Sequence, residues 1–272
     1  MRLGGAIVDI WDSPEEWAGL ALEMGYRAVF FPLDYHASDA DIEAFRAAAE
    51  AHDLVIAEVG IWNNLLERDP AKQRANQERA VRQLELADHV GARCCVNISG
   101  SRSGQWDGPH PENLTPETFA EVVRITQEII DAARPTRTFY TLEPMPWMFP
   151  HTADSYLELL AAVDRERFGC HLDFVNVINS LEKYYRNGEL IDEWFRKLGP
   201  HIRSCHAKDI RLGTGLTLHL DECRPGTGQL DYPTLIRNLR TLGDDACLML
   251  EHMSEREDYV AGMRFLNSLL QS

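Results

Sequence analysis

The sequence predicts an α/β protein built as a single (β/α)8 TIM barrel, and three observations support this fold class. Short apolar stretches alternate with amphipathic stretches along the whole chain, which is typical of parallel strands joined by helices. Eight such pairs account for residues 1–272 with nothing left over, so we predict one domain. The turn after the first apolar stretch, DIWDSPEE, lacks the glycine-rich pattern of a doubly wound open sheet, which is the competing architecture.

The eight predicted strands are apolar or alternate between apolar and polar residues. They cover residues 3–8, 28–31, 54–59, 93–98, 138–143, 168–173, 202–206 and 246–251. A predicted helix follows each strand; the first begins at residue 14, and the others cover residues 39–52, 70–90, 116–133, 153–163, 180–198, 232–242 and 256–270. Ser13 before Pro14 and Thr115 before Pro116 are typical helix caps and support two of these starts.

Three connections that follow predicted strands are long enough to bear on function. Residues 99–113 have no periodicity, and an irregular span of this length in a compact domain is typical of a lid or binding loop. Residues 144–151 contain Trp147 and Phe149, which predict an apolar cap beside Glu143. Residues 210–230 contain a predicted hairpin in which LTLHLD forms one strand.

The charge balance argues against a nucleic-acid partner. The chain has 27 basic and 43 acidic residues and a formal net charge of −16, whereas nucleic-acid binders present a basic face to the phosphate backbone. No apolar run approaches ~18 residues and no leader precedes the first strand, which predicts a soluble, cytoplasmic protein without a membrane span. The six cysteines form no CxxC pair, so buried free thiols in a reducing compartment are expected.

Four predicted strands end on side chains that bind metal ions. Glu143, Asp173, His206 and Glu251 each close a strand-like run, and reactive groups of (β/α)8 barrels lie at the C-terminal ends of the strands. Three hard oxygen donors and one imidazole suit Mn²⁺ best, with Mg²⁺, Co²⁺ or Zn²⁺ as alternatives. Without a cation, three converging carboxylates would repel one another. The competing interpretation is that these are ordinary polar residues at strand ends.

Two of the four candidates also suit acid–base chemistry. Glutamates on different strands could flank a bound sugar, so that one removes a proton next to a carbonyl and the other returns it. A bound metal ion would polarise that carbonyl. Glu143 and Glu251 are the candidate catalytic pair.

Around these residues the sequence resembles the xylose isomerase-like barrel superfamily over essentially the whole chain. The shared features are EP at Glu143, HAKD around His206 and RPGTGQLDY before the last strand. The superfamily includes sugar isomerases and epimerases, inosose dehydratase, hydroxypyruvate isomerase and an apurinic-site endonuclease. The resemblance implies that Glu143, Asp173, His206 and Glu251 are the metal ligands, with Glu143 and Glu251 as the acid/base pair. It also implies a small-molecule sugar or polyol substrate and, by analogy only, a homo-oligomer.

The chain departs from the ketohexose epimerases of that superfamily at three positions. Asn176 replaces a histidine three residues after the aspartate ligand, Phe149 replaces a second glutamate, and Leu212 replaces an arginine. The HxKD pattern is similar to that of the inosose dehydratase branch, and Lys208 shares strand parity with His206, so its ammonium could face the site. The reaction class is therefore better defined than the substrate.

Five residues are candidates for substrate binding because they lie in loops or beside the predicted ligands. They are Lys208, Arg224, Asn176, Trp147 and Trp106. An indole could stack on a sugar ring, and Arg224 could hold an anionic group through two hydrogen bonds. Glu58, at the end of the third predicted strand, could reach the substrate or support the site. His171 is expected in the core beneath Asp173.

The sequence thus predicts a divalent-metal-dependent sugar isomerase or epimerase that abstracts a proton next to a carbonyl. A lyase or dehydratase that acts on a keto-sugar, keto-glycoside or inosose with the same site is the alternative. A phosphodiesterase would need further metal ligands and a basic surface, neither of which is evident in the sequence. A barrel that binds a sugar without catalysis stays open as well.

Overall fold

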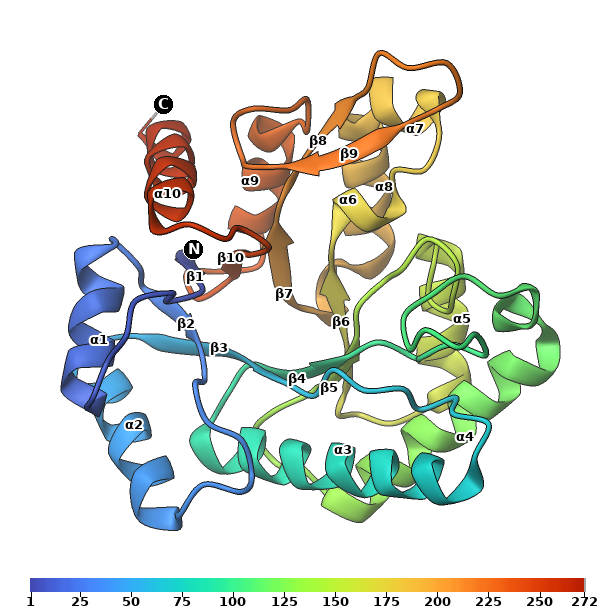
Figure 1. Cartoon of the computed structure of the whole chain (residues 1–272), viewed down its shortest axis with the longest axis horizontal. Coiled ribbons are helices and arrows are strands. Elements are labelled where there is room, and N and C mark those ends of the chain that lie inside the picture. Colours follow the sequence, from blue (N-terminus) through green and yellow to red (C-terminus); the bar gives the residue numbers. More distant parts are fainter. Residues whose placement is uncertain (272) are drawn as a thin grey trace.

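The computed structural model describes residues 1–271 and contains a closed barrel of parallel strands surrounded by helices, which confirms the predicted fold class (Figure 1). Around the barrel the strands follow the order β1-β10-β7-β6-β5-β4-β3-β2. Their bounds are β1 (Arg2–Gly5), β2 (Ala28–Phe30), β3 (Val55–Gly60), β4 (Cys94–Asn97), β5 (Tyr140–Leu142), β6 (Phe168–Leu172), β7 (Ile202–Ala207) and β10 (Cys247–Leu250). Parallel pairing needs crossover connections, and the helices supply them.

The helices cover the outside of the barrel, and two of them start at the predicted caps. Ser13 and Thr115 accept hydrogen bonds from the backbone N–H groups of Glu16 and Thr118. The helices are α1 (Pro14–Glu23), α2 (Asp39–Ala51), α3 (Pro70–Val90), α4 (Pro116–Ala133), α5 (Ala153–Val163), α6 (Phe174–Val177), α7 (Leu181–Tyr185), α8 (Asn187–Leu198), α9 (Tyr232–Arg240) and α10 (Arg256–Leu270). Their buried faces and the strands share a large apolar core, and Ala28, Ala57, Cys247 and Met249 of the strands form a separate, smaller cluster.

Two predicted elements differ from the structure. The helix predicted over residues 180–198 is divided into α7 and α8, because the Asn187 side chain donates to the carbonyl oxygens of Tyr184 and Gln229 at 2.7 and 3.0 Å. These bonds tie the break to a neighbouring loop. The stretch LTLHLD contributes only its last two residues to the hairpin, in which β8 (Asp209–Leu212) pairs antiparallel with β9 (Leu220–Cys223). The preceding residues of that stretch form the exposed tip.

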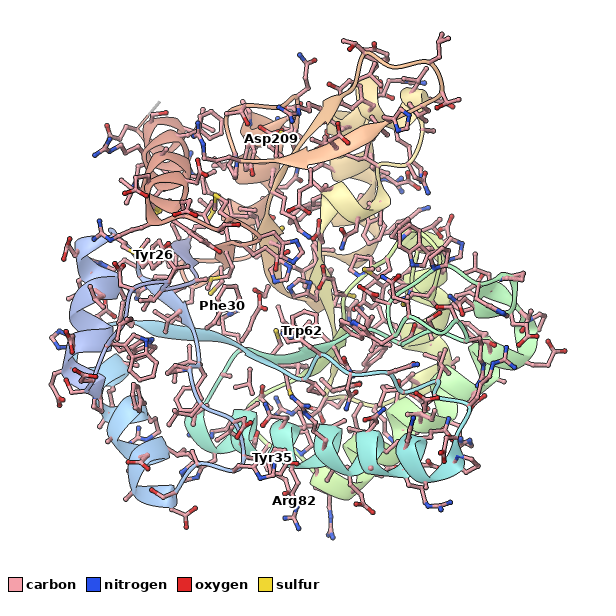
Figure 2. All side chains as sticks on the ribbon, viewed as in Figure 1. Tyr26, Phe30, Tyr35, Trp62, Arg82 and Asp209 are labelled. Atoms are coloured by element: carbon pink, nitrogen blue, oxygen red, sulfur yellow. The ribbon has the colours of Figure 1, made fainter. Side chains whose placement is uncertain are left out.

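A buried carboxylate, Asp209, fixes the loop between the hairpin and α9. Its Oδ1 accepts from the N–H groups of Ile210 and Leu230 at 2.8 and 2.9 Å, and its Oδ2 accepts from those of Gly226 and Gly228 at 3.0 and 2.9 Å. A Cβ atom at Gly228 would lie 2.3 Å from Oδ1 of Asp209, so this approach requires glycine. Figure 2 shows Asp209 beside the hairpin. One side chain therefore holds the sequence RPGTGQL in place.

We expect Asp209→Ala to lower the free energy of unfolding by about 3 kcal/mol or more, because several buried N–H groups lose a charged acceptor. Denaturant unfolding followed by circular dichroism measures the change. Asp221→Asn on the exposed face of β9 is the control and should be within about 0.5 kcal/mol of the parent. Equal stabilities for the two variants would show that the loop does not depend on Asp209.

The cysteines and the helices agree with two further predictions from composition. All six cysteines are free thiols, and only Cys223 is less than fully buried. Among residues 1–271, none of the helices combines the length and the apolar character that a membrane span requires.

Candidate metal centre

Four side chains from neighbouring strands meet at the C-terminal mouth of the barrel. Glu143, Asp173 and Glu251 directly follow β5, β6 and β10, and His206 lies in β7. These strands are consecutive around the barrel, so their ends bring the four groups together. One donor atom from each residue lies within 4.8 Å of the donor atoms of the other three. Nδ1 of His206 is 2.8 Å from Glu251, 3.5 Å from Glu143 and 3.8 Å from Asp173.

The atoms that point to this centre fit a divalent cation. Nδ1 of His206, Oδ2 of Asp173 and Oε1 of Glu251 are buried, and within residues 1–271 none has a hydrogen bond of acceptable geometry. The other oxygen of Asp173 is already used, because Oδ1 accepts from the backbone N–H of Asn176 at 3.2 Å. Buried polar atoms that make no hydrogen bond are rare in folded proteins, and here their charged neighbours are His206 itself and the Lys208 ammonium. Three carboxylate oxygens and one imidazole nitrogen are a suitable donor set for Mn²⁺, Mg²⁺, Co²⁺ or Zn²⁺.

The three carboxyl groups have different electrostatic environments. Burial raises the pKa of Glu143, and the nearby His206 only partly offsets this effect. Burial also opposes ionisation of Asp173, but the Lys208 ammonium and His206 together outweigh it and hold the pKa of Asp173 well below its ordinary value. For Glu251, His206 and Lys208 together outweigh burial and lower the pKa. Glu143 is therefore the carboxyl group that most readily holds a proton, and acid–base sites are characterised by such unequal carboxyl groups.

Lys208 places a buried ammonium next to the carboxylates, as its strand parity predicts. Its Nζ lies 2.7 Å from Asp173 and 2.8 Å from Glu251, and its side chain is 1% exposed. Burial by itself disfavours the charge, but Asp173 and Glu251 outweigh this cost and raise the pKa of Lys208 well above its ordinary value. The site therefore contains a fixed positive charge that would act beside any bound cation.

A second layer of buried polar groups lies under His206. One carboxylate oxygen of Glu58 is 3.2 Å from Nε2 of His206, and the other is 3.1 Å from Nε2 of His171. The Ser204 hydroxyl also donates to Glu58. Burial raises the pKa of Glu58, but the two imidazoles outweigh burial and lower it. When Nε2 of His206 donates its proton to Glu58, the Nδ1 lone pair is free to face the three carboxylates.

We expect Glu58→Gln to weaken divalent-metal binding by about 10- to 100-fold, the range observed when the outer partner of a metal-binding histidine is lost. Glutamine preserves the size of the side chain but has one oxygen acceptor for two imidazoles. Calorimetric titration with Mn²⁺ measures the affinity, and Glu128→Gln on the exposed face of α4 is the matched control. Unchanged affinity would show that His206 is oriented without Glu58.

A cavity of about 590 Å³ opens above the centre. Of the five predicted substrate-binding residues, Lys208, Asn176 and Trp106 line it, and Asn176 donates to Glu143 at 2.8 Å. The structure does not bring Trp147 or Arg224 to this lining: Nε1 of Trp147 donates to the carbonyl oxygen of Asp107 at 2.7 Å, and Nε of Arg224 pairs with Asp258 on α10 at 3.2 Å. Trp147 therefore braces the loop that carries Trp106.

Sequence reasoning missed a pair of groups at the rim of the cavity. Nδ1 of His252 lies 3.2 Å from Nζ of Lys208 and 3.2 Å from the Glu222 carboxylate on β9. His252 has a left-handed backbone, with φ of 58°, which turns the chain directly after Glu251. The only signal in the sequence is the position of His252 next to a predicted ligand. Glu222 gives no signal, because the hairpin brings it to the rim.

The closed barrel with acidic and imidazole donors at its mouth defines the class of the protein: a (β/α)8 barrel with a candidate metal centre. The chain belongs to the xylose isomerase-like TIM barrel family, whose sequence profile matches residues 18–269. A sequence comparison with curated proteins found no match.

Solved structures share this fold over nearly their full length. A 3-keto-D-glucoside 4-epimerase from E. coli has a TM-score of 0.73 and 16% identity, with 100% of both chains covered. A probable 3-DHS dehydratase from Bacillus anthracis has a TM-score of 0.72 and 18% identity, with 98% of this chain and 99% of that chain covered. A xylose isomerase-like protein from Mycobacterium smegmatis in complex with magnesium has a TM-score of 0.68 and 19% identity, covering 98% and 90%. At these identities the likeness establishes the fold alone.

Proposed function

We propose that the protein is a divalent-metal-dependent sugar isomerase or epimerase that moves a proton next to a carbonyl. The observation that carries this proposal is the convergence of three carboxylates and one imidazole within 4.8 Å, under a cavity lined by a buried lysine. Glu143, Asp173, His206 and Glu251 would hold the cation, with Mn²⁺ favoured. When bound, the cation would supply a Lewis acid that polarises the substrate carbonyl.

The residues of the chain would carry the proton transfers. One member of the pair Glu143 and Glu251 removes, as its carboxylate, the proton on the carbon next to the carbonyl, and the other delivers one, from its protonated form, to the opposite face, so the substrate gains and loses one proton. The raised pKa of Glu143 brings its basicity closer to neutral pH, which favours proton abstraction. Lys208 and Asn176 would donate hydrogen bonds to substrate oxygens, and Trp106 would contact the bound substrate.

Elimination is the second candidate function, and the position of Lys208 favours it. A buried ammonium that contacts Asp173 and Glu251 could protonate a leaving oxygen while Glu143 removes the neighbouring proton. The C–O bond would then break and release water or an alcohol. The structurally similar proteins include both an epimerase and a probable dehydratase, in agreement with one barrel supporting either outcome.

Turnover in D₂O tests the proposal and separates the two reactions. The protein is loaded with Mn²⁺ and incubated with free keto-sugars, keto-glycosides and inososes, and the products are identified by NMR. A deuterium-labelled isomer or epimer supports proton transfer alone, whereas release of water or an alcohol supports elimination. Absence of both products with every metal and every substrate would overturn the proposal.

A further inference from the structure

The cavity above the metal centre divides into two chemically distinct sectors. The polar sector lies over the ends of β5, β6, β7 and β10 and includes Glu143, Asn176, Lys208, Glu251 and His252, with Met145 and Tyr259 beside them. The apolar sector lies over the ends of β2, β3 and β4 and consists of Phe30, Phe31, Trp62, Ile98 and Trp106. Each set of strands is contiguous in the barrel, so each sector is a continuous wall. The ligand that fits this cavity has one polar end and one apolar end.

The cavity is also larger than a monosaccharide requires. A hexose displaces on the order of six water molecules, or roughly 180 Å³ at about 30 Å³ each. A sugar held at the carboxylates would therefore fill about a third of the 590 Å³. Cavities of about 300–1,000 Å³ hold ligands of drug size.

The aromatic wall starts immediately beside the candidate metal ligand. The ring of Phe30 is 6.1 Å from the ring of His206, and that of Trp62 is 6.4 Å from it. Figure 2 shows Phe30 and Trp62 near the centre of the ring of strands. Trp62 has φ of 51°, a left-handed conformation that is strained for a bulky residue. Its ring lies against Gly60, where a Cβ atom would be 2.2 Å from Nε1.

The part of the aromatic wall that contains Trp106 is held in place by hydrogen bonds. Trp106 lies in the long loop after β4, where the Ser101 hydroxyl and the Asn113 amide both donate to the carbonyl oxygen of Gly108 at 2.6 and 3.1 Å. Trp147 holds the next residue of the loop, Asp107. The wall is therefore formed before a ligand binds. Preorganised aromatic surfaces bind ligands at a low entropic cost.

The indoles of this wall keep surface for a ligand to cover. Trp62 is 41% exposed and Trp106 is 39% exposed, whereas most other large aromatic residues are buried. The two carboxylates on this side have partners within the chain: Glu58 contacts His171 and His206, and Asp107 accepts from the Gln105 amide at 2.7 Å. The wall therefore offers flat apolar surface instead of partners for sugar hydroxyls.

We propose that the substrate is a keto-glycoside whose sugar binds at the carboxylates and whose aglycone is a flat apolar group, such as an aromatic ring, bound by Phe30, Trp62 and Trp106. The proposal depends on the proposed function only for the statement that the polar end is a sugar. Aromatic rings favour stacked or edge-on contacts with other rings, which a free sugar or a small alkyl glycoside cannot provide.

Binding of two glycosides tests this inference independently of turnover. Phenyl glucoside and methyl glucoside carry the same sugar, and calorimetry on the Mn²⁺-loaded protein measures both affinities. We expect phenyl glucoside to bind at least tenfold more tightly. Trp62→Ala and Trp106→Ala should each reduce this preference several-fold while metal content is unchanged. Tyr185→Ala, a 67% exposed aromatic residue on α7, is the control and should preserve the preference.

The possible results separate the two proposals. Equal affinities for the two glycosides, or a preference that neither tryptophan variant alters, would overturn the aglycone inference even if keto-sugars are converted. Selective binding of phenyl glucoside that depends on Trp62 and Trp106 would support it even if no sugar is converted, in which case only the proposed function fails.

Discussion

Glu143→Gln is expected to lower kcat by about 10²- to 10⁴-fold, the contribution of a positioned acid–base group. The amide keeps the size of the side chain and one oxygen donor, but it cannot accept the substrate proton. Steady-state kinetics with the substrate found in the D₂O screen measures the loss. Deuterium exchange next to the carbonyl should fall in parallel, because proton abstraction is the step that is removed.

The same variant needs a control for metal content, because Glu143 is also a candidate ligand. Metal analysis and assays in excess Mn²⁺ separate a lost ligand from a lost base. Glu128→Gln on the exposed face of α4, a carboxylate outside the cavity lining, should retain activity. Full turnover by Glu143→Gln with metal bound would exclude Glu143 as the base.

Removing divalent metal with a chelator is expected to lower kcat/KM by about a thousandfold, because Lewis-acid stabilisation of several kcal/mol is lost. The protein should remain folded. Lys208 pairs with Asp173 and Glu251, so the carboxylates keep a positive neighbour after the metal has left. The loss of unfolding free energy should be near 2.7 kcal/mol when the ion had been present at about 100 times its Kd.

Activity assays and thermal unfolding before and after chelation measure both effects. Added Mn²⁺ should restore activity and melting temperature together. The activity recovered with Mg²⁺, Co²⁺ or Zn²⁺ would rank these metals against Mn²⁺. Metal uptake should also release protons, because the surrounding carboxylates raise the pKa of His206 and its Nδ1 must lose its proton to become a ligand. Undiminished turnover in the chelated protein would contradict a metal-dependent mechanism.

Much of the fold could be predicted because its signals are local. The bounds of α3, α4, α5 and α10 agree with the predicted helices, since their caps and apolar spacing lie within the same stretch of sequence. The division between α7 and α8 could not be predicted, because it depends on Asn187 reaching Gln229, a residue far along the chain. The second strand of the hairpin was predicted too early in the sequence for a similar reason, since pairing with β8 decides which residues form β9.

The candidate site was only partly predictable. Strand ends of a closed barrel share one mouth, so four polar strand ends could be expected to meet; their roles as ligands stay predictions. The contact of Glu58 with His206 could not be derived, because β3 and β7 are not neighbours and the contact crosses the barrel interior. Arg224 was predicted to bind substrate because it lies in a loop near the mouth of the barrel. In the structure its side chain pairs with Asp258 instead.

The β8–β9 hairpin determines which face of β9 each side chain lies on, as well as where the strand lies. Successive side chains of a strand point to opposite faces, and the pairing of Ile210 with Glu222 decides which face carries this carboxylate toward His252. A one-residue deletion in the turn at 213–219 that shifts the register would turn the side chains of β9 to opposite faces and place a neighbour of Glu222 at the rim. A two-residue shift would again direct every second side chain to its original face. Length variation in this turn is thus constrained by parity, although its tip is open to solvent.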